Sequence, residues 1–311
     1  MRAIAINSYG NHEVLQIKEV VIPTISDNEV LVKVYATSVN QFDLKIRNGF
    51  LREQISISFP FILGLDFSGE VVSVGASVEN FRVGDLVFGR NPIEKSGTYA
   101  EYVAVHQDHL VKKPKNINHL QAASLPTAGI AAWRSLIDLG QLEGNEKVLI
   151  IGASGGVGSL AVQIASYKVN MTIGVCSSAN VAMIKELGAS VAIAYDIEDL
   201  ATSIKDVDLV IDTIGGAYLD TASRVVKDKG KYISIEPPQD SAYQKKYPNI
   251  IYKSISSLPS ASILQQIVSK VESLHIKPVI DTVFNFEEFE EAHLYCETNR
   301  AKGKIIIQVS Y

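Results

Sequence analysis

Four glycines lie close together near the middle of the chain, in Gly152-Ala153-Ser154-Gly155-Gly156-Val157-Gly158. The preceding residues 148–151 are apolar and mostly β-branched, as in a strand covered on both faces. Residues 159–168 have apolar side chains at helical spacing, which predicts a helix packed on that strand. A glycine turn at a helix N-terminus presents free backbone N–H groups and the positive end of the helix dipole. We therefore expect a phosphate or pyrophosphate at Ser154, Gly155, Gly156 and Val157.

The pattern of this turn is Ala-x-Gly-x-x-Gly, whereas the strict dinucleotide-binding pattern begins with glycine. A tight strand-to-helix turn without a ligand therefore remains an alternative. Residues 148–167 also carry no charge, over roughly the length of a membrane span. Because the glycines, Ser154 and Ser159 interrupt this stretch, we predict a turn and not a transmembrane helix.

The residues after the next predicted strand, 172–175, indicate which dinucleotide would bind. An acid about 20 residues after the glycines would bind the ribose 2′-hydroxyl of NAD. Residues 176–180 are CSSAN, and no acid follows until Glu186. Ser177, Ser178 and Asn180 could donate hydrogen bonds to a 2′-phosphate, so the pattern favours NADPH. The turn has no Arg or Lys, and these three side chains could instead cap the following helix.

The chain has two regions with different patterns of apolar residues. Up to residue 118, short apolar or alternating runs separated by Gly and Pro predict a β-rich region. From residue 119, short apolar strands alternate with amphipathic helices, which predicts a doubly wound parallel sheet. A helix at 261–274, an acidic helix at 286–296 and a strand at 304–309 follow. The predicted domains are 1–118, 119–261 and 262–311.

Composition narrows the class of protein. The chain has 311 residues, 47% of them hydrophobic, and a formal net charge of −5, which gives no electrostatic support for nucleic-acid binding. Residues 1–6 alternate like a first strand and are too short for a signal peptide. Cys176 and Cys296 cannot form a disulfide framework or a structural zinc site. We expect a cytoplasmic protein with neither metal nor membrane anchor.

Further motifs occur in order along the chain. They are Asn40-x-x-Asp43 followed by Lys45 and Arg47, Gly64-x-Asp66-x-x-Gly69-x-Val71, Tyr99-Ala100-Glu101-Tyr102, Ala122-Ala123-Ser124-Leu125-Pro126, Ala132-Trp133 and Gly303-Lys304. With the glycine turn, they make the chain resemble the medium-chain dehydrogenase/reductase superfamily, in its zinc-free quinone oxidoreductase-like branch. The resemblance implies an α/β fold with a Rossmann domain inserted in a GroES-like catalytic domain, and an active site in the cleft between them. It also implies a homodimer or homotetramer.

Departures from zinc-dependent relatives concern the metal. Those relatives have a Gly-His-Glu motif where this chain has Gly64-Leu65-Asp66, and neither cysteine lies in the N-terminal catalytic region. The ligands for a catalytic zinc are therefore missing, and we expect no metal. Lys45 stands where some quinone reductases have a tyrosine, which argues against proton donation by a tyrosine there.

Reduction without a metal suits an acceptor whose conjugation spreads the incoming charge, such as a quinone or another α,β-unsaturated carbonyl. By resemblance, Asn40 is the first candidate for a polar group at the acceptor, and Asp43 orients its neighbours. Lys45 could donate to an oxyanion or be a solvated surface lysine. Three aromatic residues could line the acceptor site or belong to the core: Phe50, Phe59 and Tyr99.

More cofactor contacts come from the sheet rule and the resemblance. Ile214 and Gly215 follow a predicted strand that should end near the nicotinamide. The resemblance adds Thr127 near the nicotinamide, Tyr195 near the adenosine phosphate and Lys304 at a phosphate. Two other functions stay open, namely an enoyl-thioester or enone reductase on the same scaffold and a non-catalytic NADPH-binding sensor or structural protein.

Overall fold

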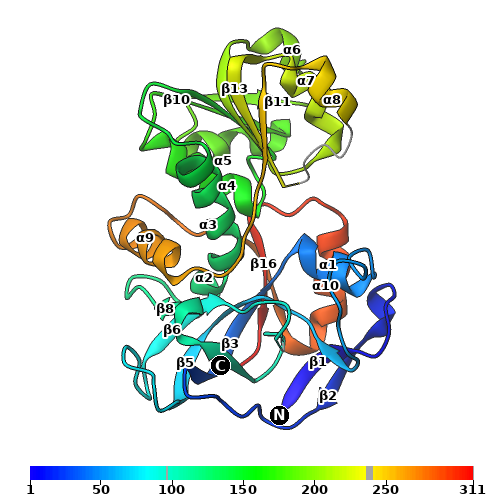
Figure 1. The fold of residues 1–311 in the computed structure, drawn as a ribbon, viewed down its shortest axis with the longest axis vertical. Coiled ribbons are helices and arrows are strands. Elements are labelled where there is room, and N and C mark those ends of the chain that lie inside the picture. The colour runs from blue at the N-terminus through cyan, green and yellow to red at the C-terminus, as the bar shows by residue number, and fades with distance from the viewer. Residues whose placement is uncertain (96, 236–240, 311) are drawn as a thin grey trace. The chain divides into compact units, whose positions relative to one another are not determined.

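The chain folds into two units, one built on a parallel sheet and one on mainly antiparallel sheets (Figure 1). Unit 1 comprises residues 1–130, 258–273 and 278–311, and unit 2 comprises residues 131–257 and 274–277. The structure is a computed structural model that describes residues 1–95, 97–235 and 241–310. The expected α/β class, a Rossmann-like sheet with a β-rich GroES-like part, is confirmed. The predicted boundaries at 118/119 and 261/262 stay predictions.

Unit 2 is built on six parallel strands in the order β11-β10-β9-β12-β13-β14. The predicted buried strand is β9, whose residues 148–151 are fully buried between neighbours on both sides. The helix after it, α4, begins at Gly156 and not at Ser159 as expected, so two of the glycines form its first turn. The uncharged stretch 148–167 is thus strand, turn and helix. Within the described ranges, no helix is long and apolar enough to cross a membrane.

The strands of unit 2 are β9 (Lys147–Ile151), β10 (Met171–Cys176), β11 (Val191–Ala194), β12 (Val207–Asp212), β13 (Val226–Ser234) and β14 (Ile251–Ser254). Its helices are α4 (Gly156–Ser166), α5 (Val181–Glu186), α6 (Leu200–Ser203), α7 (Leu219–Ser223) and α8 (Ser241–Lys246). The chain enters this unit through α3 (Pro126–Trp133), which is followed by a π-helical turn, Arg134–Leu139.

Unit 1 contains a seven-stranded sheet in which β15-β16-β3-β5-β6-β8 are neighbours and β7 pairs with β3, beside a three-stranded sheet β2-β1-β4. The closing strand β16 (Lys304–Gln308) pairs with β3, so the end of the chain returns to this unit. The other strands are β1 (Arg2–Ile6), β2 (Leu15–Glu19), β3 (Glu29–Val39), β4 (Phe61–Ile62), β5 (Asp66–Val74), β6 (Leu86–Arg90), β7 (Tyr102–His106), β8 (Leu110–Lys112) and β15 (Ile280–Asn285). The helices are α1 (Gln41–Arg47), α2 (His119–Ala123), α9 (Ala261–Glu272) and α10 (Phe289–Glu297).

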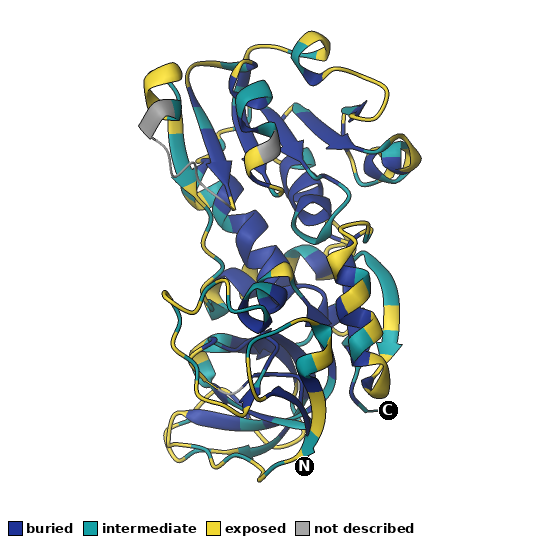
Figure 2. Ribbon diagram, turned by 90° about the vertical axis from the view of Figure 1, so that its right-hand side faces the viewer, coloured by how far each residue is buried: buried dark blue, intermediate teal, exposed yellow. Residues whose placement is uncertain are grey.

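Each unit has its own hydrophobic core, visible as the dark strands in Figure 2. In unit 1 the core lies among β1, β3 and β5 and is closed by residues of α10 such as Phe289 and Ala292. In unit 2 it includes Leu149, Ile173 and Val210 on adjacent strands. These cores fix the strand ends, where the polar residues of the candidate site begin.

Candidate functional site

The glycine turn joins β9 to α4 in unit 2. Gly155 is the N-cap residue of α4 and supplies no side-chain cap, and residues 154–157 are partly accessible. The first N–H groups of a helix have no partner within the helix. The N–H of Gly155 donates to the carbonyl of Gly152 at 3.0 Å, but those of Gly156 and Val157 at the helix start face an accessible N-terminus, which is the geometry that binds a phosphate.

Two glycines of this turn, Gly158 and Gly155, lie in different surroundings. A Cβ at Gly158 would lie 2.1 Å from the carbonyl oxygen of Gly152, so only glycine lets the helix pack this closely on the strand end. A Cβ at Gly155 would have only that same oxygen near it, at 3.4 Å. The side of Gly155 is thus open space that a side chain would fill, and a ligand can approach its backbone there.

The turn after β12 is held by a buried carboxylate. Asp212 is fully buried, and its Oδ1 accepts the N–H groups of Ile214 and Gly215, both at 2.9 Å. Its Oδ2 accepts the hydroxyl of Tyr232 at 2.8 Å. Ile214 is 47% exposed on this turn, so the structure makes it accessible at the strand end where the sequence predicts a cofactor contact.

The structure places the residues expected at the ribose in different surroundings. Ser178 is exposed, and Asp196 accepts hydrogen bonds from both its N–H and its hydroxyl. Asn180 is only 8% exposed, and among the described residues its Oδ1 has no hydrogen-bond partner. Ser177 is partly accessible, and Tyr195 is 41% exposed. An acid therefore does lie at this turn, contrary to the interpretation of residues 176–180 alone.

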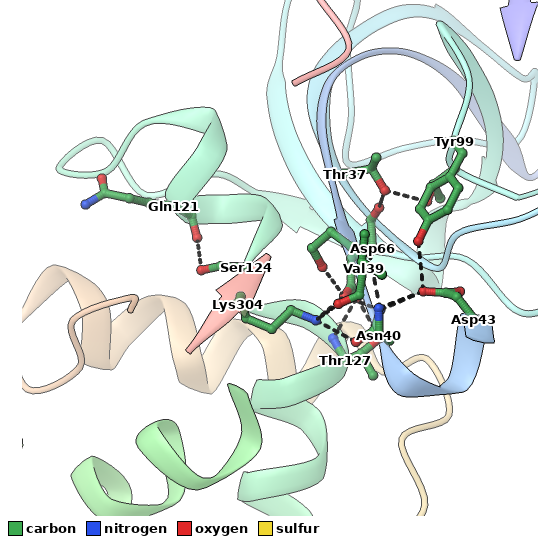
Figure 3. Close-up of polar contacts among 12 residues, drawn as sticks. Thr37, Val39, Asn40, Asp43, Asp66, Tyr99, Gln121, Ser124, Thr127 and Lys304 are labelled. Atoms are coloured by element: carbon green, nitrogen blue, oxygen red, sulfur yellow. Dashed lines mark hydrogen bonds and ion pairs between the residues drawn. The ribbon is translucent and has the colours of Figure 1, made fainter. Parts of the chain in front are cut away.

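In unit 1, strand pairing gathers a polar cluster around Asp66, which we call the Asp66 cluster: Ser38, Asn40, Asp66, Thr127 and Lys304. The last four of these residues are labelled in Figure 3. Ser38 of β3 pairs with Asp66 of β5, and Val39 pairs with Ile305 of β16. This register places Asp66 and Lys304, the first residues of β5 and β16, next to Asn40, which follows β3. The cluster is therefore a consequence of the sheet.

Asp66 is fully buried, yet its carboxylate is well satisfied. Oδ1 accepts the N–H of Thr127 at 2.7 Å and its hydroxyl at 2.6 Å, at the start of α3. Oδ2 accepts the hydroxyl of Ser38 at 2.6 Å and the amide of Asn40 at 3.0 Å, and it lies 3.5 Å from the ammonium of Lys304. A buried carboxylate is tolerated when hydrogen bonds and an opposite charge surround it.

Asn40 is the N-cap residue of α1 and is partly accessible. Its Oδ1 accepts the ammonium of Lys304 at 2.6 Å, and its Nδ2 donates to Asp66 at 3.0 Å. The remaining contacts of Nδ2, with the carbonyl of Ser38 and with Asp43, are both 3.4 Å long. One amide N–H is thus firmly held, and the other is held only weakly.

Asp43 lies fully buried behind Asn40. Its Oδ2 accepts the backbone N–H of Asn40 at 2.8 Å and the hydroxyl of Tyr99 at 3.1 Å. Among the described residues, its Oδ1 has no hydrogen-bond partner. Burial, with the nearby charge of Asp66, raises the pKa of Asp43 to about 6. This carboxyl therefore holds the backbone of Asn40 at the start of α1, and the role expected of Asp43 stays a prediction.

The other predicted residues have the following positions. Lys45 is half-buried in the last turn of α1. Tyr99 is fully buried and its ring packs edge-on against His293, so it belongs to the core. Phe50 is 72% exposed, and Phe59 is 41% exposed with its ring against Tyr9. Thr127 and Lys304, which the resemblance places at the cofactor, both bind Asp66 within unit 1.

Comparison with known proteins identifies the family. Residues 26–115 match the model of the alcohol dehydrogenase GroES-like domain, and residues 187–307 match that of the zinc-binding dehydrogenases. The human mitochondrial NAD(P)H oxidoreductase RTN4IP1 is 31% identical, over 99% of this chain and 89% of that protein. The chain belongs to the medium-chain dehydrogenase/reductase superfamily, in its quinone oxidoreductase-like branch.

Two further relatives of this quinone oxidoreductase-like chain are informative. The chloroplastic NADPH-dependent alkenal/one oxidoreductase of Arabidopsis thaliana is 32% identical, over 99% of this chain and 79% of that protein. The structure of the quinone oxidoreductase from Coxiella burnetii superposes with a TM-score of 0.92 at 33% identity, and 99% of each chain is covered. This chain is therefore an NAD(P)H-dependent oxidoreductase by family. The names of relatives include mitochondrial and chloroplastic proteins, and the cytoplasmic location stays a prediction.

The donor set of this quinone oxidoreductase-like chain fits a nicotinamide dinucleotide. Residues 154–157 would hold the pyrophosphate, and the turns at Ile214 and Tyr195 are accessible at the same edge of the sheet, the carboxyl ends of its strands. In the described part of the chain, no group of three or more His, Cys, Asp and Glu side chains could hold a metal ion. Leu65, at the position of the zinc-ligating histidine of zinc-dependent relatives, is fully buried.

Four residues of these sites have no role predicted from the sequence: Ser38, Asp66, Asp196 and Asp212. Asp66 lies in a family motif, and its type, an acid within an apolar run, was the available signal. Asp196 follows the third strand of unit 2 directly, but only strand pairing shows which turn it faces.

Proposed function

We propose that this protein is a zinc-independent NAD(P)H-dependent reductase of conjugated carbonyl compounds, either quinones or α,β-unsaturated aldehydes and ketones. The observation that carries the proposal is the accessible glycine turn at the start of α4, with open space at Gly155. The names of the relatives support the acceptor class, since they include a quinone oxidoreductase, an alkenal/one oxidoreductase and a 2-methylene-furan-3-one reductase.

Unit 2 has the binding role. The backbone N–H groups of Ser154, Gly156 and Val157 would bind the pyrophosphate, whereas the N–H of Gly155 already donates to the carbonyl of Gly152 at 3.0 Å. The turn held by Asp212 would place Ile214 and Gly215 near the nicotinamide. When bound, the reduced nicotinamide supplies the hydride. The pyrophosphate contacts are made before and after the reaction alike, so they affect the binding of the dinucleotide more than the chemical step.

Unit 1 has the role of stabilising the charge that develops on the acceptor oxygen. The weakly held amide N–H of Asn40 is the available donor, because its contacts at 3.4 Å can be exchanged for a better acceptor at little cost. Lys304 and Asp66 hold the amide in orientation, and the ammonium of Lys304 favours negative charge nearby. Asp43 holds the backbone of Asn40, and solvent supplies the proton that completes the reduction.

The expectation of NADPH rests on Ser177, Ser178 and Asn180. Ser178 is bound to Asp196 and Asn180 is buried, so the proposal is made here for NAD(P)H. A homodimer or homotetramer and a cytoplasmic location remain part of the proposal.

The test is turnover with a panel of quinones, enals, enones and enoyl thioesters, with NADH and NADPH as donors. We expect oxidation of the donor with quinones or enones. The Asn40→Ala variant should lower kcat about a hundredfold, as for loss of one oxyanion donor, while the affinity for the dinucleotide stays unchanged. The exposed Asn170→Ala variant in unit 2 is the matched control.

Three outcomes would contradict the proposal. Binding of the dinucleotide without turnover of any acceptor would favour the sensor or structural alternative. Turnover of enoyl thioesters alone would favour the enoyl reductase. Full activity of the Asn40→Ala variant would show that Asn40 does not take part in the chemical step.

A further inference from the structure

Two turns of unit 2 lie side by side because their strands are paired. Strands β10 and β11 are parallel neighbours, with Cys176 opposite Ala194. The N–H of Tyr195 then donates to the carbonyl of Cys176 at 3.0 Å, which extends the pairing by one residue. The residues that follow the two strands therefore meet at the carboxyl edge of the sheet, next to the strand that leads into the glycine turn.

Asp196 binds Ser178 with both oxygens of its carboxylate. Oδ1 accepts the N–H of Ser178 at 2.8 Å, and Oδ2 accepts its hydroxyl at 2.7 Å. These two hydrogen bonds lower the pKa of Asp196, so its charge is present at neutral pH. Each carboxylate oxygen has a further lone pair and can accept another hydrogen bond. Because Asp196 is exposed, that capacity is available to a ligand.

The same turn has no cation to offset this charge. Residues 176–181 include no Arg or Lys, and the ammonium of Lys185 on α5 donates to the carbonyl of Ser190. The hydroxyl of Ser178 is already donated to the acid, and Asn180 is buried. A phosphate group at this turn would bring up to two negative charges beside a carboxylate. A ribose hydroxyl would instead find an acceptor.

We propose that Asp196 determines cofactor choice in this chain, and that it makes the ribose turn bind NAD(H) in preference to NADP(H). The acid has the role that an Asp or Glu at the end of the second strand has in NAD-binding sheets, but it comes from the turn after the third strand. The proposal rests on the proposed function, in which the dinucleotide lies on the glycine turn.

The test measures binding directly, by titration calorimetry of the full chain with NAD⁺ and NADP⁺. We expect wild-type protein to bind NAD⁺ at least about tenfold more tightly, the size of one unfavourable charge contact near a protein surface. Asp196→Asn keeps an acceptor for the N–H of Ser178 but removes the charge. It should lower the ratio of the NAD⁺ affinity to the NADP⁺ affinity about tenfold. Asp196→Arg supplies a guanidinium for a phosphate and should reverse the preference.

Glu186→Gln is the control, because it removes one exposed negative charge from the same unit and should leave the ratio unchanged. Tighter binding of NADP⁺ by wild-type protein would overturn the proposal. So would an Asp196→Asn variant with a lower melting temperature and an unchanged ratio, since Asp196 would then only cap the turn at Ser178. If neither dinucleotide binds to any variant, the proposed function itself fails.

Discussion

Lys304 and Asn40 are 264 residues apart in the sequence, and the ammonium of Lys304 donates to Oδ1 of Asn40 at 2.6 Å. The contact exists because β16 pairs with β3, at whose end Asn40 lies. The last strand of the chain therefore completes a polar cluster that begins with the third. The resemblance predicts Lys304 at a phosphate, which stays a prediction; in the structure its ammonium contacts Asn40 and lies beside Asp66.

Replacement of Lys304 by methionine should destabilise unit 1. The side chain of Lys304 is 7% exposed and that of Asp66 is fully buried, so the change leaves a buried carboxylate without its cation. Loss of one partner from a buried ion pair costs about 3–5 kcal/mol. The measurement is the free energy of unfolding in urea, with turnover recorded in parallel.

The exposed Lys302 offers a matched control for this variant, since it precedes the same strand. Lys302→Met should change the free energy of unfolding by no more than about 0.5 kcal/mol. Equal stability of the two variants would show that Lys304 does not hold the cluster together.

Asp43 should make stability depend on pH. Its pKa is raised from 3.8 to about 6, so between pH 4 and 6 the folded protein binds more protons at this site than the unfolded chain does. The contribution of Asp43 to the free energy of unfolding therefore falls as pH rises through this window, by about 3 kcal/mol, and is constant above it. Unfolding in urea from pH 4 to pH 7 measures it.

Asp43→Asn isolates this effect, because the amide keeps an acceptor for the N–H of Asn40 and removes the titration. His119 and His293 have pKa values lowered by burial to about 4 and about 3, and they remain in both proteins. The wild-type free energy minus that of the variant should fall with rising pH. A flat difference would mean that Asp43 titrates normally.

Replacement by alanine should affect stability at one glycine of the turn and ligand binding at another. Gly158→Ala places a Cβ against the carbonyl of Gly152 and should destabilise the protein by about 1–3 kcal/mol. Gly155→Ala meets only ordinary contact distance and should leave stability unchanged. Because its methyl group fills the space where a ligand approaches, it should weaken dinucleotide binding at least about tenfold.

Thermal unfolding and calorimetric titration of the two variants separate these effects. If a stable Gly155→Ala protein bound the dinucleotide as tightly as the wild type, the pyrophosphate would not bind at this turn. A stable Gly158→Ala protein would show that α4 can move away from β9 without cost.

Local patterns predicted the elements that a few neighbouring residues determine. The apolar run of β9, the glycines and the amphipathic α4 follow one another directly, so the strand–turn–helix unit is confirmed from its own residues. The start of α4 was wrong by a few residues because glycine has low helix propensity, and here the close packing of Gly158 outweighs it.

Strand pairing explains what the sequence alone did not predict. Asp196 lies well beyond the position where an acid was sought, and only the parallel register of β10 and β11 brings it to Ser178. In the same way, Asp66 becomes the centre of a cluster because β3, β5 and β16 are neighbours. No pattern within one segment encodes such contacts, since they depend on the order of strands in the sheet.

Arg47 provides the last prediction, because it joins α1 to α10. Its guanidinium is fully buried and contacts Nδ1 of His293 at 3.1 Å and Oε1 of Glu297 at 2.5 Å. Burial, together with the charge of Arg47, lowers the pKa of His293 to about 3, so the ring is neutral and Nδ1 can accept. Since Asn40 caps α1, these contacts also fix the helix that begins at the candidate site.

Arg47→Met should lower the free energy of unfolding by about 3 kcal/mol, at the low end for a broken buried pair, because Glu297 is 37% exposed and water can solvate it. Amide hydrogen exchange in α1 should become faster, and kcat should fall more than the affinity for the dinucleotide. The exposed Arg52→Met variant is the control. Faster exchange in α1 with unchanged kcat would contradict the link between this helix and the chemistry, since Asn40 would then keep its orientation through Lys304 and Asp66 alone.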